Sequence, residues 1–186
     1  TYYNAVPGIV EEEMKKVSKL TGRDYKPFNY FGAEDAENVI VLMGSGAEAV
    51  AETVAALNKE GHKLGMVNVH LYRPFSVKHF LSALPSTVKT LTVLDRTKES
   101  GALGDPLYLD VVTALVEAGR GDIRVLGGRY GLGSKEFTPT MIKVVFENAE
   151  KADAKNHFTV GINDDVTHTS LPMGELYEAA PEGTVS

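Results

Sequence analysis

Residues 38–61 read NVIVLMGSGAEAVAETVAALNKEG, and this stretch decides the fold class. Its apolar run Val39–Met43 predicts a short buried strand. The segment Ala47–Glu60 places apolar residues at helical spacing and stops at a glycine, which predicts a helix. Only Gly44-Ser45-Gly46 separates the two. A strand that feeds a helix through a short turn is the building unit of a mostly parallel sheet.

The same alternation repeats from this unit toward the C-terminus. Strands and helices that follow one another along a chain predict an α/β fold of three layers, with helices on both faces of a mostly parallel five-stranded sheet. After the first unit, the predicted segments are strand Leu64–Val69, helix Ser76–Leu84, strand Val88–Leu94, a helix from Asp105-Pro106 to Gly119, strand Ile123–Leu126, a glycine-rich loop Gly127–Gly133, helix Thr138–Glu150 and strand Phe158–Ile162.

The sequence divides into three parts around this unit. Residues 1–37 predict an amphipathic helix over Ile9–Leu20, followed by an ordered connection whose aromatic side chains need burial. Residues 38–163 form the α/β domain, and 164–186 predict an irregular tail that leads toward a further domain. The apolar residues that share one face of the first helix are Ile9, Val17 and Leu20.

Composition excludes several classes of protein. The 186 residues include 25 Asp and Glu against 19 Lys and Arg, and this net charge of −6 argues against a general nucleic-acid binder. Cysteine is absent, so the chain alone supplies no disulfide, thiolate nucleophile, cysteine zinc site or iron–sulfur ligand. No apolar run approaches the ~18 residues that span a membrane. We therefore expect a soluble chain, and its first residue, Thr1, suggests a piece excised from a longer protein.

The loops at the carboxyl edge of the predicted sheet carry unusual concentrations of charge and glycine. Ligands and partners of open parallel sheets meet this edge, so we predict that it contacts a partner surface or a ligand. The alternative is a set of solvated loops with salt bridges among themselves. Arg73 precedes Pro74, which favours a fixed guanidinium that pairs with Asp95, Glu99 or another domain. The candidates for interdomain contact are Arg73, Asp95, Arg96, Lys98, Glu99 and Arg129.

A weaker candidate for phosphate binding is the turn Gly44, Ser45 and Gly46. The pattern Gly44-x-Gly46-x-x-Ala49 between a strand and a helix matches a dinucleotide-binding loop, whose free N–H groups attract phosphate. The acidic residue expected about 20 positions further on is missing. Ser45 and Glu48 also form an S-x-x-E pattern, which predicts a capping box. Tight strand-to-helix packing is therefore the favoured interpretation.

The sequence contains no motif for metal binding or for nucleophilic catalysis. The five histidines show no H-x-x-x-H or H-E-x-x-H spacing, and no metal site is predicted. Ser45 lies in G-S-G rather than G-x-S-x-G, so no nucleophile and no catalytic residue are assigned.

Four segments in order resemble one known family, the second domain of pyruvate:ferredoxin (or flavodoxin) oxidoreductase. The resemblance covers nearly the whole chain. The four segments are Val39–Gly46, Leu71–Phe75, Val93–Leu107 and Gly128–Pro139; His157–His168 and Glu182–Ser186 resemble the end of that domain and the approach to the next.

The resemblance implies a large, cytoplasmic, usually dimeric enzyme built from many domains. Such an enzyme decarboxylates pyruvate with thiamine diphosphate and Mg²⁺, transfers the acetyl group to coenzyme A, and passes electrons through 4Fe-4S clusters to ferredoxin or flavodoxin. It also implies the fold of the transketolase C-terminal domain, with the cofactor residues on other domains. We therefore expect a non-catalytic structural domain that is inactive alone. The alternatives are a stand-alone Rossmann-like nucleotide- or phosphate-binding protein and a separate subunit that acts as an interaction module.

Overall fold

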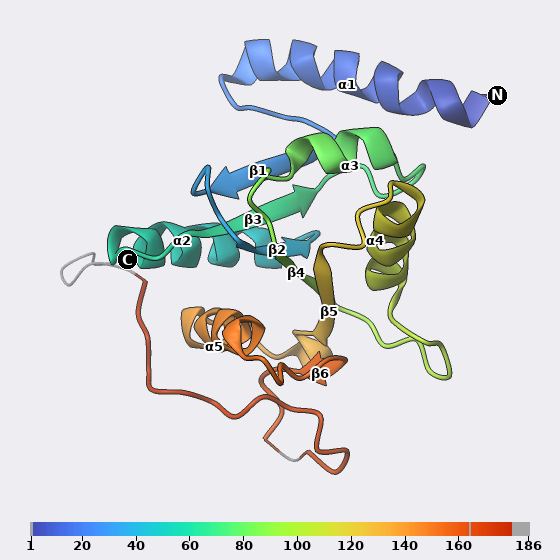
Figure 1. Ribbon diagram of the computed structural model, residues 1–186. Coiled ribbons are helices and arrows are strands. Elements are labelled where there is room, and N and C mark those ends of the chain that lie inside the picture. Colours follow the sequence, from blue (N-terminus) through green and yellow to red (C-terminus); the bar gives the residue numbers. More distant parts are fainter. Residues whose placement is uncertain (1, 164, 180–186) are drawn as a thin grey trace.

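A six-stranded sheet with the strand order β1-β3-β2-β4-β5-β6 runs through the middle of the molecule (Figure 1). The computed structural model describes residues 2–163 and 165–179. The strands are β1 (Phe28–Gly32), β2 (Asn38–Leu42), β3 (Leu64–Val69), β4 (Thr90–Asp95), β5 (Arg124–Arg129) and β6 (Phe158–Thr159). The helices are α1 (Tyr2–Thr21), α2 (Gly46–Lys59), α3 (Val77–Ala83), α4 (Pro106–Glu117), the short η1 (Leu132–Ser134) and α5 (Pro139–Glu150).

The sheet has one strand more than the sequence predicts. Strands β2 to β6 are parallel, as expected, but β1 pairs antiparallel with β3 at the edge, with Phe28 opposite Val69. The extra strand comes from the aromatic connection before residue 38. The ring of Phe28 packs 5.3 Å from the ring of Phe75 and 5.6 Å from that of Phe80. The added strand buries Phe28 and partly buries Tyr30, whereas Phe31 remains 47% exposed, so the expected burial of the aromatic side chains holds only in part.

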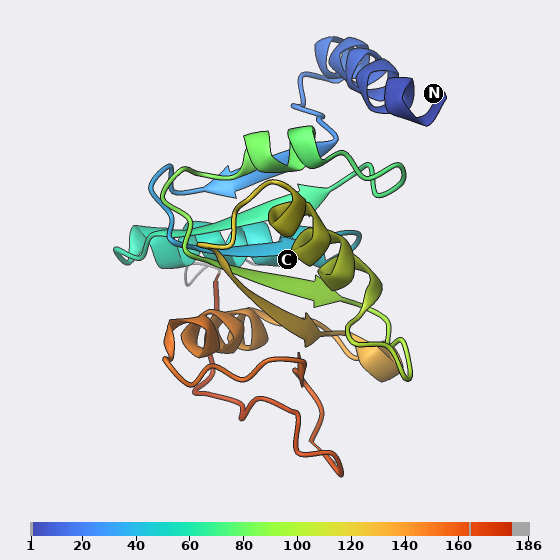
Figure 2. The same cartoon turned by 45° about the vertical axis from the view of Figure 1, so that its right-hand side comes forward.

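Helices cover both faces of the sheet, and the three-layer prediction is confirmed (Figure 2). Helices α2 and α5 pack on one face, where Ile40 and Leu42 of β2 point. Helices α3 and α4 pack on the other face, together with Val39 and Val41. Because both faces of β2 are buried, its sequence is a continuous apolar run rather than an alternating one.

Two strands end three residues away from their predicted ends at the carboxyl edge, whereas β2 and β4 end within one residue of theirs. Strand β5 continues to Arg129, so the first three residues of the predicted loop Gly127–Gly133 belong to the sheet. Strand β6 keeps only two residues of the predicted Phe158–Ile162. A Cβ atom on Gly128 would lie 2.3 Å from Cζ of Phe158, so the glycine lets the buried ring cross the strand. The glycines therefore serve close packing inside the sheet.

The C-terminal segment is irregular but attached over its described residues. The backbone N–H of Tyr177 donates to Oγ1 of Thr140 at 2.9 Å, and its hydroxyl donates to Oε1 of Glu60 at 2.8 Å. Burial and the neighbouring Glu60 carboxylate raise the pKa of Tyr177 to about 12, so the hydroxyl keeps its proton. The segment thereby ties α5 to the end of α2. The resemblance at Glu182–Ser186 lies outside the described residues.

No helix among residues 2–163 and 165–179 is long and apolar enough to cross a membrane.

Candidate functional site

The candidate site is the carboxyl edge of the sheet, where β2, β4 and β5 end. The parallel registers bring Val41 of β2, Val93 of β4 and Gly127 of β5 to one level, so the loops that follow gather at one edge. The longest of them, residues 96–104, projects beyond the sheet between β4 and α4 (Figure 1). We call residues 96–104 the β4–α4 loop.

Asp95 ends β4 and lies beneath the surface rather than on it. Its carboxylate is buried and accepts hydrogen bonds from the backbone N–H groups of Leu107 at 3.0 Å and Tyr108 at 3.2 Å. A negative group at this position compensates the positive end of the α4 dipole. Burial raises the pKa of the Asp95 carboxyl, while the two backbone hydrogen bonds act in the opposite direction. The role of Asp95 is thus to fix the start of α4 against the end of β4.

Arg129 is also turned inward, into a buried ion pair. Its Nε atom lies 2.7 Å from Oδ2 of Asp105, and the two side chains are 14% and 4% exposed. The other carboxylate oxygen of Asp105 accepts the backbone N–H of Glu99 at 3.1 Å. Asp105 precedes α4 as predicted, although its own side chain makes no cap hydrogen bond. This pair joins β5, the start of α4 and the base of the β4–α4 loop.

Arg73 finds a partner that the sequence did not indicate. Its Nη1 atom lies 2.8 Å from Oδ2 of Asp110 on α4, not beside Asp95 or Glu99. The guanidinium also stacks 3.9 Å from the ring centroid of Tyr72. Its Nη1 also donates to the backbone carbonyl oxygen of Tyr72 at 3.2 Å, and its Nη2 donates to the Tyr72 hydroxyl at 3.1 Å. The side chain of Arg73 is 57% exposed, and it holds the β3–α3 connection on α4.

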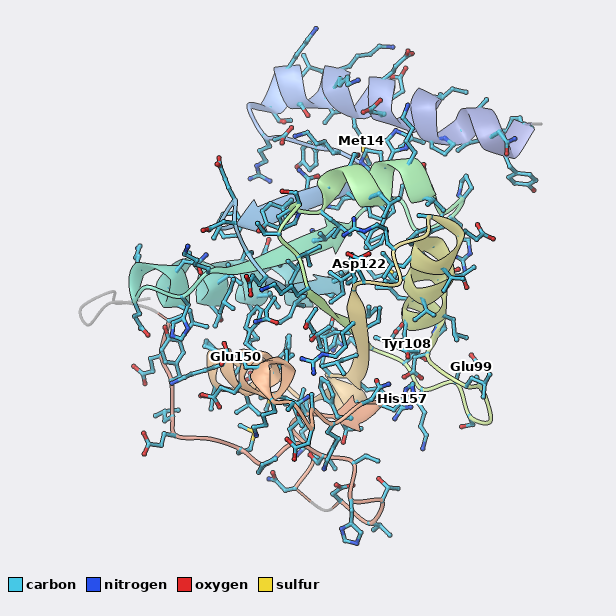
Figure 3. All side chains as sticks on the ribbon, viewed as in Figure 1. Met14, Glu99, Tyr108, Asp122, Glu150 and His157 are labelled. Carbon is cyan, nitrogen blue, oxygen red and sulfur yellow. The ribbon has the colours of Figure 1, made fainter. Side chains whose placement is uncertain are left out.

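The exposed part of the site is the β4–α4 loop itself. Arg96, Lys98 and Glu99 are all exposed, and Figure 3 shows Glu99 on the projecting part of the loop. The sequence interpretation missed Leu103, which is 91% exposed at the same place. A single leucine between small residues has no periodicity, so nothing in the sequence tells whether it points inward or outward. Together these residues offer an apolar anchor among charges.

The candidate phosphate turn is used for packing. Gly44 has a φ of +81°, and a Cβ atom on Gly46 would lie 2.7 Å from the ring of Tyr130. The predicted capping box is wrong, because Ser45 makes no cap hydrogen bond; its Oγ accepts Nη1 of Arg96 at 2.8 Å instead. The ring of Tyr130 therefore packs closely against Gly46, as the packing interpretation of this turn expects. A cavity of about 400 Å³ remains beside the turn, lined in part by Ser45, Arg96, Tyr130, Lys135, Phe137 and Thr138.

No group of three or more His, Asp or Glu side chains that could hold a metal ion occurs within the part of the chain that the structure describes.

Comparisons with known proteins give matches over most of the chain. The family model "Pyruvate:ferredoxin oxidoreductase core domain II" matches residues 36–142, more than half of the chain. The pyruvate:ferredoxin oxidoreductase of Moorella thermoacetica is 57% identical over 183 residues, which are 98% of this chain and 16% of that protein. The probable pyruvate-flavodoxin oxidoreductase of Escherichia coli is 53% identical over 179 residues, 94% of this chain and 15% of that protein.

A solved structure is a more distant match. The 2-oxoglutarate:ferredoxin oxidoreductase of Magnetococcus marinus aligns with a TM-score of 0.47 and 24% identity, over 72% of this chain and 21% of that one. The chain spans about one sixth of the length of the two curated relatives named above. On the match over residues 36–142, the chain belongs to the family of the pyruvate:ferredoxin oxidoreductase core domain II.

Proposed function

We propose that this chain is an architectural domain of a pyruvate:ferredoxin (or flavodoxin) oxidoreductase. The whole enzyme, a cytoplasmic dimer, converts pyruvate and coenzyme A to acetyl-CoA and CO₂ and passes electrons to ferredoxin or flavodoxin. Thiamine diphosphate with Mg²⁺ and the 4Fe-4S clusters supply the chemistry from other domains. The residues here do not fit a cluster, because the chain has no cysteine to supply thiolate ligands.

The observation that carries the proposal is an exposed loop on a fixed base. Asp105 holds the base of the β4–α4 loop through the backbone of Glu99 and through Arg129. Above this base, Leu103 is almost fully exposed, on the same loop as the exposed charged residues Lys98 and Glu99. An apolar anchor with a charged rim is the usual composition of a contact surface. We therefore assign the β4–α4 loop, with the half-exposed side chain of Arg73, to docking against a neighbouring domain.

Such a domain affects the rate of the reaction by positioning the reacting groups that other domains carry. Reacting groups on two other domains must approach within a fraction of an ångström of their productive separation, and a misplacement of about 1 Å can lower a rate by about 100-fold. A preformed loop loses little conformational entropy when it docks. The hydrogen bonds of Asp95 and Asp105 keep this loop base ordered before docking.

The test compares three loop-edge variants of the full-length polypeptide, Leu103→Asp, Glu99→Ala and Arg73→Ala. Loss of a contact of about 1–2 kcal/mol is expected to lower pyruvate-dependent ferredoxin reduction about tenfold, with the largest effect for Leu103→Asp. The control is Val116→Asp, since Val116 is also exposed but lies at the far end of α4. Steady-state turnover and hydrogen exchange of residues 96–104 are measured. Unchanged values for all three variants would contradict the docking role.

A further inference from the structure

A cavity of about 400 Å³ opens at the carboxyl edge, beside the turn between β2 and α2. Residues that follow three parallel strands line it: Ser45 follows β2, Arg96 follows β4, and Tyr130 follows β5. Its volume lies in the lower part of the range of about 300–1,000 Å³ that small-molecule pockets occupy. The cavity therefore has room for a ligand larger than a bare ion.

The cavity lies where the order of the strands reverses. From β2 the chain passes through α2 to β3 on one side of β2, and it later returns to β4 on the other side. The helices that follow these two neighbouring strands, α2 and α4, lie on opposite faces of the sheet. In open α/β sheets, loops that leave in opposite directions open a crevice at the carboxyl ends of the strands, and ligands bind there. The topology therefore places this cavity where a ligand of such a sheet is expected.

Two cationic side chains, Arg96 and Lys135, line the cavity. Neither makes an ion pair with a carboxylate of the described residues. Arg96 is nevertheless held in place, because its Nη1 donates to Oγ of Ser45 at 2.8 Å and its Nε would lie 2.8 Å from a Cβ atom on Gly131. The alternative of charged loops that form salt bridges among themselves does not describe these two cations.

Two hydroxyl groups add further donors to the lining. Oγ of Ser45 accepts from Arg96, and Oγ1 of Thr138 accepts the backbone N–H of Met141 at 3.4 Å, so neither hydroxyl proton is used in these bonds. The two residues precede α2 and α5, helices of 14 and 12 residues whose positive dipole ends lie at the cavity. Glu136 is the only carboxylate among the lining residues. Such a lining suits an anion with several acceptor oxygens.

An apolar wall lies next to these donors. The ring of Phe137 is 4.4 Å from the ring of Tyr130, and both rings line the cavity. The wall favours an anion that carries an organic group. A phosphate monoester has a charge of about −1.5 to −2 at pH 7 and three acceptor oxygens, whereas a carboxylate has one charge and two oxygens. The number of donors therefore favours a phosphate monoester.

We propose that this cavity binds the phosphate group of a small phosphorylated molecule. Arg96 and Lys135 contact the phosphate, and Phe137 contacts the organic group. The site differs from a dinucleotide-binding loop, because side chains rather than the glycine turn supply the charged contacts, and the ring of Tyr130 packs against Gly46. The inference does not rest on the proposed function, since every residue of the site belongs to this chain.

The first experiment titrates the full-length polypeptide with phenyl phosphate at constant ionic strength and follows hydrogen exchange of residues 44–50 and 130–141. Binding predicts slower exchange in both segments. Arg96→Ala and Lys135→Ala should each weaken the apparent affinity by about tenfold or more, because each removes a charged donor. The control is Lys98→Ala, an exposed cation that follows β4 but does not line the cavity, and it should leave the affinity unchanged. No change of exchange at about 10 mM phenyl phosphate, or equal affinity in all variants, overturns the proposal.

The second experiment tests the class of ligand with the same readout. Inorganic phosphate should bind more weakly than phenyl phosphate because it lacks the ring, and benzoate should bind more weakly because it offers fewer oxygens. Glu136→Gln should tighten the binding of phenyl phosphate by about twofold or more, because it removes the lining carboxylate. Equal binding of inorganic phosphate, tighter binding of benzoate, or an unchanged affinity of the Glu136 variant contradicts the assignment of a phosphate monoester to this cavity.

Discussion

Replacing Asp105 by Ala is expected to lower the free energy of unfolding by about 3–5 kcal/mol. The change leaves the guanidinium of Arg129, whose side chain is only 14% exposed, without its carboxylate, and it removes the acceptor of the Glu99 backbone N–H. An uncompensated buried charge is among the costliest changes that a single substitution can make. Denaturant unfolding of the chain with and without the substitution measures the loss.

The matched control for this substitution is Asp122→Ala. Asp122 also pairs with an arginine, Arg120, at 2.9 Å, but the aspartate side chain is 61% exposed. Exposed pairs contribute about 0–1 kcal/mol, so the control should change stability little. Hydrogen exchange of the β4–α4 loop should increase only in the Asp105 variant. Equal losses of stability in the two variants would show that the burial of the Arg129 pair is not the cause.

Replacing Gly128 by Ala is expected to destabilise the protein by about 1–3 kcal/mol through overpacking. The new Cβ atom would lie 2.3 Å from Cζ of Phe158 and 2.9 Å from Cδ2 of Leu94, and both side chains are buried. Neither the ring of Phe158 nor the side chain of Leu94 can move aside without disturbing the sheet. Thermal unfolding measures the effect, and Gly121→Ala is the control because a Cβ there meets no atom within 4 Å.

A second substitution separates overpacking from a general loss of backbone freedom. Phe158→Leu removes the ring atoms that the new methyl group would meet. The double variant Gly128→Ala with Phe158→Leu should therefore be more stable than the sum of the two single losses predicts, by about 1 kcal/mol or more. Strictly additive losses would indicate that the contact with Phe158 is not responsible.

Local patterns predicted the parallel part of the fold well. The continuous apolar run that starts at Val39 forms the buried strand β2, and the apolar residues at helical spacing after it form α2. The prediction of an α/β fold with a mostly parallel sheet is confirmed. Strand β1 was not predicted, because its stability comes from rings of α3 and its approach that are distant in sequence. Short strands of this kind depend on tertiary packing more than on their own residue preferences.

The sequence predicted which loops meet at the carboxyl edge of the sheet, but it did not predict their side-chain contacts. The positions of the strand ends and the charge and glycine content of the loops predicted a contact surface at the carboxyl edge. Side-chain partners depend on which helix crosses above each loop, so Asp110 as the partner of Arg73 and Arg96 as the donor to Ser45 were not predictable. The assignment of Arg73, Arg96, Lys98 and Glu99 to interdomain contact stays a prediction that the proposed variants test.

The position of β1 also constrains the order in which the chain can assemble during synthesis. Strand β1 precedes β2 in the sequence, yet its neighbour in the sheet is β3. A ribosome releases the N-terminal segment first, so Phe28–Gly32 has no pairing partner until Leu64–Val69 has emerged. In that interval the aromatic side chains of the segment are uncovered. The ring of Phe28 stays uncovered even longer, until Phe75 and Phe80 have also emerged.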